Sequence, residues 1–155
     1  IWVFGKGIEI LGMIKIFKDD KSTGKELRKA AKSLKEHNSN NGALTPYLVA
    51  FPEGTRTKDK GYKMSEFKRG LFTIAIKYDL PIIPIASYGG LDVTPKSSWI
   101  FKKGTIYEKI LEPLFPKNYG GSSIKEKSIL LQNDTRQRIN QGLHELIRTY
   151  GNGTI

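Results

Sequence analysis

The chain lacks cysteine altogether and has only two histidines among its 155 residues. Without cysteine there can be no disulfide framework, no thiolate metal site and no Cys nucleophile. Any catalysis would therefore depend on histidine, carboxylates or hydroxyl groups.

Long hydrophobic runs are also missing. The apolar opening stretch, residues 1–17, is interrupted by Lys6, Glu9 and Lys15, well before the roughly 20 residues that a spanning helix needs. The same stretch has no basic segment leading into an unbroken apolar one, so a signal peptide is not predicted. Because the chain does not begin with Met, we expect it to be truncated at its N-terminus.

Acidic residues are scarce relative to basic ones: 15 Asp and Glu against 26 Lys and Arg leave a net charge of +11. This excess favours an anionic partner, which is a nucleic acid, an anionic membrane surface or a phosphate-bearing substrate. Aromatic residues beside basic ones are candidates for insertion into a lipid interface, and core packing is the alternative. These aromatics are Trp2, Phe4, Trp99 and Phe101. Residues 98–103 are the best candidate, because bulky apolar residues there precede Lys102 and Lys103 in a predicted loop.

Helical and strand-like patterns alternate along the chain. Apolar spacings of three and four predict helices, and short apolar or alternating runs predict strands. The predicted helices cover residues 23–37, 65–78 and 122–150, and the predicted strands cover residues 47–51, 82–86 and 104–110. This order predicts an α/β fold over residues 1–155 as a single domain, with a mostly parallel sheet flanked by helices and with functional loops at the carboxyl ends of its strands. Gly142 is a weak point in the last helix.

Residues Phe51–Arg56 carry the most informative chemistry, because a carboxylate, a glycine, a hydroxyl and a guanidinium follow a predicted buried strand. Arg56 can grip a phosphate through two parallel hydrogen bonds, Gly54 lets the backbone approach closely, and Glu53 can orient a polar neighbour or a substrate hydroxyl. The alternative is an ordinary strand-ending turn with a Glu–Arg ion pair.

This hexapeptide resembles the third motif of the glycerolipid acyltransferase family, which includes the 1-acylglycerol-3-phosphate acyltransferases. Phe67–Gly70 resembles the Phe-Lys-x-Gly element that follows it, and Leu80–Ile85 resembles the fourth, proline-containing motif. The similarity extends over residues 12–113 and implies the α/β fold of the family and its chemistry at a membrane surface.

The second motif of the family is matched poorly. Gly12–Lys18 falls at its place, with Lys18 or Lys21 standing in for an Arg and Asp19 or Asp20 for an acid. A lysine cannot reproduce the two-pronged contact of an arginine.

The resemblance implies a set of site residues. Those that would bind substrate are Glu53, Gly54, Thr55, Arg56 and Lys68, where Lys68 extends the phosphate pocket at the start of a helix. The alternative for Lys68 and Arg69 is that they form a solvated basic face without a role in binding. Pro84 is expected to form a structural bend beside the acyl channel. No metal or bound cofactor is implied, and the co-substrate would be acyl-CoA or an acyl carrier protein thioester.

The catalytic element of the family, a His followed by an Asp at the fifth place, is absent. Neither His37 nor His144 has this Asp, and both are interpreted as helix-surface residues. Either truncation removed the element or the protein has lost it, and we favour truncation, so the chain is expected to be inactive by itself.

The predicted function is therefore transfer of a fatty acyl group from a thioester to lysophosphatidic acid or a related lysophospholipid, in phospholipid biosynthesis. We expect membrane association, at the endoplasmic reticulum in a eukaryote or the inner membrane in a bacterium. The alternatives are a non-catalytic module that binds anionic phospholipid and, ranked last, a nucleic-acid binder, for which no motif is found.

Overall fold

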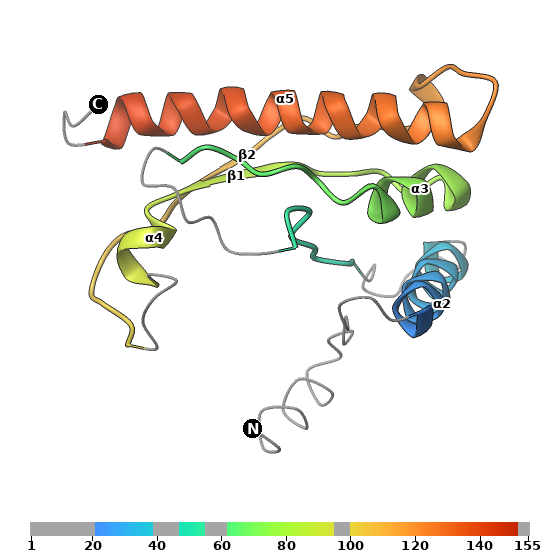
Figure 1. Ribbon diagram of the computed structural model, residues 1–155, viewed down its shortest axis with the longest axis horizontal. Helices are drawn as coiled ribbons and strands as arrows, with labels where there is room; N and C mark the ends of the chain where they lie inside the picture. Colours follow the sequence, from blue (N-terminus) through green and yellow to red (C-terminus); the bar gives the residue numbers. More distant parts are fainter. Residues whose placement is uncertain (1–20, 39–46, 55–61, 95–99, 152–155) are drawn as a thin grey trace. The chain divides into compact units, whose positions relative to one another are not determined.

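A computed structural model describes residues 21–38, 47–54, 62–94 and 100–151 (Figure 1). The chain forms two compact units, residues 1–49 and 50–155, which are considered separately. The prediction of a single domain stays a prediction. In chain order the elements are α2 (Lys21–Asn38), α3 (Arg69–Tyr78), β1 (Ile85–Tyr88), α4 (Gly90–Val93), β2 (Tyr107–Ile110), the short 3-10 helix η1 (Pro116–Asn118) and α5 (Ile124–Tyr150).

The first unit contributes α2, which confirms the helix predicted over residues 23–37 and begins two residues earlier. Leu27 and Ala31, four residues apart and so on one face, are buried. On the exposed surface Lys29 pairs with Glu26 at 2.9 Å, a contact of neighbours one turn apart.

In the second unit α5 packs along α3 and the two strands (Figure 1). One core cluster joins the α3 region to α5, and a second joins β1 to the C-terminal half of α5. The first consists of Phe67, Phe72, Ala75, Leu114 and Leu131, and the second of Ala86, Leu143 and Leu146. The predicted closing helix is therefore confirmed, and it supplies buried residues to both clusters. Among the described residues, no helix has the length and apolar character to cross a membrane.

The sheet that the structure describes is antiparallel, so the prediction of a mostly parallel sheet is wrong for this part of the chain. β1 pairs with β2 from Ile85 opposite Ile110 to Tyr88 opposite Tyr107, and an isolated antiparallel bridge joins Ile82 to Leu114. The only described helix between the two strands is the four-residue α4, which lies beyond the end of β1 rather than across the sheet (Figure 1). A parallel pair needs a crossover over one face of the sheet, and alternation of elements in the sequence does not specify one.

Residues 47–51 do not form the buried strand that their apolar run predicts. They belong to no strand, and Tyr47 and Phe51 are 85% and 82% exposed. A strand exists only where a neighbour pairs with it, and no described segment pairs with this one.

Gly142, the predicted weak point of the last helix, has a packing role. A Cβ atom at this position would lie 3.1 Å from the Cβ of Ala86 in β1 and 3.2 Å from Leu111. Glycine therefore lets α5 approach β1 closely, at a cost in helix propensity of about 1 kcal/mol relative to alanine. The helix also has a good N-cap, because the Ser123 hydroxyl accepts a hydrogen bond from the Glu126 amide.

Candidate functional site

The site begins with the tight turn at residues 51–54, the first four residues of the third motif. The Gly54 amide donates to the Phe51 carbonyl at 3.0 Å, and Gly54 has a left-handed backbone with φ of +66°. Glycine adopts this conformation without the steric cost that other residues incur. The geometry of the turn therefore explains why glycine follows Glu53 in the motif.

Two hydrogen bonds attach this turn to the segment that leads into α3. The Ser65 amide donates to Oε2 of Glu53 at 2.8 Å, and the Lys68 amide donates to the Pro52 carbonyl at 2.7 Å. The Glu53 carboxylate thus bonds a backbone amide, and its predicted role toward a substrate stays a prediction.

The same docking places the Lys68 side chain over Gly54. A Cβ atom built on Gly54 would lie 3.6 Å from Cγ and 3.7 Å from Cε of Lys68. The structure therefore brings together Glu53, Gly54 and Lys68, which the sequence places in two separate motifs.

Helix α3 starts at this junction and adds a positive electrostatic contribution. It begins at Arg69, four residues later than predicted, because Lys68 is the N-cap and has an extended backbone. The first turn contains no acidic residue, the Lys68 and Arg69 side chains are exposed, and a Cβ atom on Gly70 would meet nothing within 4 Å. Amides at a helix N-terminus and two adjacent cations all favour an anion, so this opening is suited to a phosphate.

Two side chains of α5 donate hydrogen bonds to the backbone that precedes α3. Gln132 Nε2 donates to the Phe67 carbonyl at 2.6 Å, and Arg136 Nη2 donates to the Met64 carbonyl at 3.2 Å. The Phe67 ring is buried and stacks on Phe72 with 6.2 Å between ring centroids. Phe67 therefore fixes the backbone immediately before Lys68.

These hydrogen bonds from α5 were not predicted from the sequence. The signal available was the spacing of Gln132 and Arg136, four residues apart and therefore on one face of the helix. Nothing local indicated that this face meets the segment before α3.

The structure does not place most of the other predicted site residues. Thr55, Arg56 and Lys18 are outside the described residues, and Lys21 opens α2 with its side chain outside them as well. Pro84 is buried just before β1, and its carbonyl accepts a hydrogen bond from the Leu111 amide at 3.0 Å.

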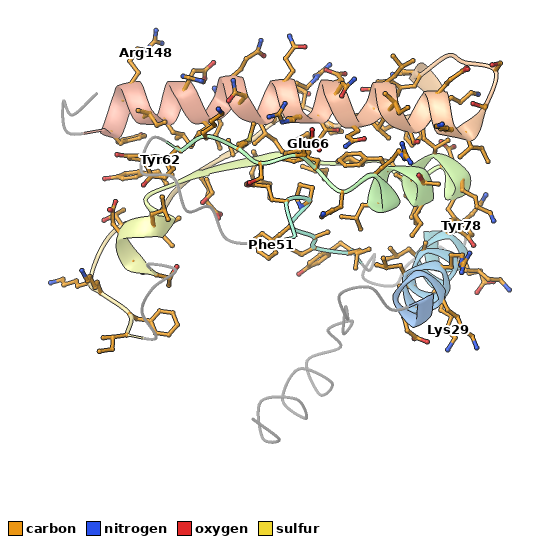
Figure 2. All side chains as sticks on the ribbon, in the orientation of Figure 1. Lys29, Phe51, Tyr62, Glu66, Tyr78 and Arg148 are labelled. Atoms are coloured by element: carbon orange, nitrogen blue, oxygen red, sulfur yellow. The ribbon has the colours of Figure 1, made fainter. Side chains whose placement is uncertain are left out.

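The two histidines lie on helices. His144 is exposed on α5, as expected of a helix-surface residue, whereas His37 belongs to α2 and its side chain is not described. Phe51, labelled in Figure 2, points away from α5.

The site is a glycine turn docked on a basic helix start, which defines an anion-binding class of site, and comparisons with known proteins connect it to a family. Residues 1–88, more than half of the chain, match the family described as Acyltransferase. The chain belongs to this acyltransferase family.

Two relatives are named for the same activity. The chain is 35% identical over 95 residues to the chloroplastic 1-acyl-sn-glycerol-3-phosphate acyltransferase BAT2 of Brassica napus, covering 61% of this chain and 24% of the relative. It is 35% identical over 80 residues to the 1-acyl-sn-glycerol-3-phosphate acyltransferase of Saccharomyces cerevisiae, covering 51% and 26%. The chain thus spans about a quarter of the length of these curated relatives.

A solved structure supports the same family. The crystal structure of the 1-acyl-sn-glycerophosphate (LPA) acyltransferase PlsC from Thermotoga maritima is similar with a TM-score of 0.61 and 33% identity, over 78% of this chain and 44% of that one. The fold is therefore a mixed α/β fold like that of PlsC, in which the described residues are mostly helical.

Proposed function

We propose that this chain supplies the acceptor-phosphate site of an enzyme that acylates lysophosphatidic acid or a related lysophospholipid. The observation that carries the proposal is the docking of the Glu53–Gly54 turn on Lys68 at the start of α3. Membership of the acyltransferase family and the names of the relatives support the reaction class.

In this proposal the phosphate of the acceptor sits at the N-terminal end of α3, beside the Lys68 ammonium. Arg56 follows Gly54 by two residues, and we assign it the second, two-pronged contact with the phosphate. Glu53 does not face the anion in this scheme, because its carboxylate already accepts a hydrogen bond from the Ser65 amide. Its role is to hold the turn in place.

The phosphate contacts orient the free hydroxyl of the acceptor for direct transfer. The hydroxyl oxygen attacks the carbonyl carbon of an acyl-CoA or acyl carrier protein thioester, the new ester bond forms, and the carbon–sulfur bond breaks. The hydroxyl proton is taken up by a general base, and a thiol is released. We do not assign the role of general base to His37 or to His144. We also propose that the enzyme works at a membrane, the endoplasmic reticulum or a bacterial inner membrane.

The test is acyl transfer from radiolabelled acyl-CoA to lysophosphatidic acid by the complete protein, with Lys68→Gln beside the parent. Losing a charge-assisted contact to phosphate should raise the acceptor KM about tenfold or more and leave the acyl-CoA KM unchanged. The matched control is Lys77→Gln, which removes an exposed lysine from the other end of α3 and should change neither constant.

Two further acceptors separate the outcomes. With monoacylglycerol, which has no phosphate, Lys68→Gln should behave as the parent does. If the complete protein transfers acyl groups to no lysophospholipid and not to glycerol 3-phosphate, the non-catalytic module that binds anionic phospholipid replaces this proposal.

A further inference from the structure

A second surface combines apolar and basic side chains, and it shares no residue with the phosphate site. In this 100–103 loop, Ile100 and Phe101 are 76% and 78% exposed. The next two residues, Lys102 and Lys103, are also exposed. The loop lies near α4, away from α5 (Figure 1).

The backbone of this loop is held by specific contacts. The Lys102 amide donates to the carbonyl of Val93, the last residue of α4, at 2.9 Å. Gly104 packs so closely on Val93 that an added Cβ atom would lie 2.8 Å from Cγ2 of that valine. The exposed apolar pair is therefore presented from an anchored loop.

Core packing, the alternative explanation for Phe101, does not fit its exposure. A phenylalanine ring in water forgoes the favourable transfer of its apolar area, whereas an ordinary core residue is buried. The combination of an aromatic ring, an aliphatic side chain and two adjacent lysines matches the layers of an anionic bilayer. Rings and aliphatic groups enter the acyl boundary, and the ammonium groups stay among the phosphates.

We propose that the 100–103 loop inserts into an anionic lipid bilayer, with Ile100 and Phe101 at the acyl boundary and Lys102 and Lys103 against the headgroup phosphates. The charge of the whole chain, +11, adds a general attraction to the same surface. The loop holds the protein at the membrane independently of catalysis, so the proposal stands even where the phosphate site has another substrate.

The test uses the complete protein reconstituted in vesicles of phosphatidylcholine and phosphatidylserine. The 155-residue chain contains no cysteine. Once any cysteines elsewhere in the complete protein are replaced by serine, Phe101→Cys creates one site for a nitroxide spin label. Leu130→Cys, an exposed apolar position on α5, is the matched control. We expect the label at 101 to collide with oxygen dissolved in lipid and to be shielded from a water-soluble nickel chelate, and we expect the reverse at 130.

The lysines are tested with the label in place. Lys102→Gln/Lys103→Gln should lower the ratio of inserted to withdrawn label about 25-fold on anionic vesicles, since each lysine near such a surface contributes about fivefold. On pure phosphatidylcholine this effect should disappear. Lys125→Gln/Arg148→Gln removes two exposed cations from α5 and should leave the ratio within about twofold.

Two results would overturn the proposal. A label at 101 that is as open to the nickel chelate as the label at 130 would place the loop in water. A label shielded from both oxygen and the chelate would show that a protein surface, rather than lipid, covers the loop.

Discussion

Gly54 and Gly70 belong to the two segments of the proposed phosphate site and have opposite backbone requirements. Gly54 is left-handed with φ of +66°, whereas Gly70 is the second residue of α3 and has open space around it. A side chain is strained at the first position and tolerated at the second. The same substitution should therefore have opposite effects on the free energy of unfolding at these two glycines.

We expect Gly54→Ala to lower the free energy of unfolding by about 1–2 kcal/mol, the cost of a left-handed backbone at a residue with a Cβ atom. Gly70→Ala should raise it by about 0.5–1 kcal/mol through helix propensity. Urea unfolding of both variants checks this, and equal effects would show that the turn adopts another conformation.

Asp134 forms a small network with the residues that titrate around it. Its carboxylate accepts hydrogen bonds from the Tyr119 hydroxyl at 2.6 Å and from Arg138 Nε at 2.9 Å. The Arg138 hydrogen bond holds the pKa of Asp134 below its ordinary value. Burial, followed by the bond to Asp134, raises the pKa of Tyr119 well above its ordinary 10.0.

The two shifts act at opposite ends of the pH range. A lowered carboxyl pKa contributes stability that is present above the unfolded pKa of about 3.9 and is lost as pH falls through the folded value. A raised tyrosine pKa contributes stability that is present below about pH 10 and is lost above it. Asp134→Asn should therefore flatten the acid side of the stability profile, and Tyr119→Phe the alkaline side. Urea unfolding across pH tests this, and profiles parallel to the parent's would contradict it.

At the scale of elements, α5 organises the second unit because it packs against α3, β1 and β2. Its apolar face supplies Leu131 to one core cluster and Leu143 to the other. Its polar side chains Gln132 and Arg136 bond the backbone before α3. One helix thus stabilises the core and holds the backbone that leads into the proposed phosphate site.

This arrangement makes Gln132 a positioning residue. Gln132→Met keeps the side-chain length but leaves the Phe67 carbonyl without its donor, so we expect about 1 kcal/mol of destabilisation. In the complete protein the acceptor KM should rise severalfold with the acyl-CoA KM unchanged. Gln137→Met, at an exposed position on the same helix, is the control.

A double variant separates positioning from general damage. If Gln132 acts through Lys68, its effect on the acceptor KM should largely vanish in a Lys68→Gln background, because the contact it positions is already gone. Fully additive effects of the two substitutions would argue against this route.

At the scale of the whole molecule, the net positive charge and an exposed apolar surface on the strand pair have opposite effects on self-association. Ile85 and Ile110 face each other across the strand pair and are 47% and 72% exposed, whereas Ala86 on the other face is buried against α5. Exposed apolar patches promote association, and a charge of +11 resists it.

We expect the 155-residue chain to self-associate more as salt screens its charge, with the effect growing as the Debye length falls below about 10 Å. Ile85→Ser/Ile110→Ser should reduce the association. Ile124→Ser/Leu130→Ser, both on α5 and each 48% exposed in the parent, should not. Sedimentation velocity at low and high salt measures this, and equal association of the two double variants would contradict it.

Much of the helical structure was predictable because helix periodicity is a local property. The spacing of Leu27 and Ala31 predicted α2, and the apolar face of residues 122–150 predicted α5. The start of α3 was placed four residues early because the Lys68 amide bonds the Pro52 carbonyl instead of continuing a helix. That contact is not local, so periodicity contains no trace of it.

The sequence by itself determined the family, through short motifs that follow one another in order, and it determined the long helices. Only the tertiary structure decided that the described strands run antiparallel, that the Gly54 turn docks on Lys68 and that Gln132 braces the site from α5. Each of these features depends on contacts between segments that are far apart in the chain. Motifs and periodicity lie within single segments, so they do not specify the free energy of such contacts.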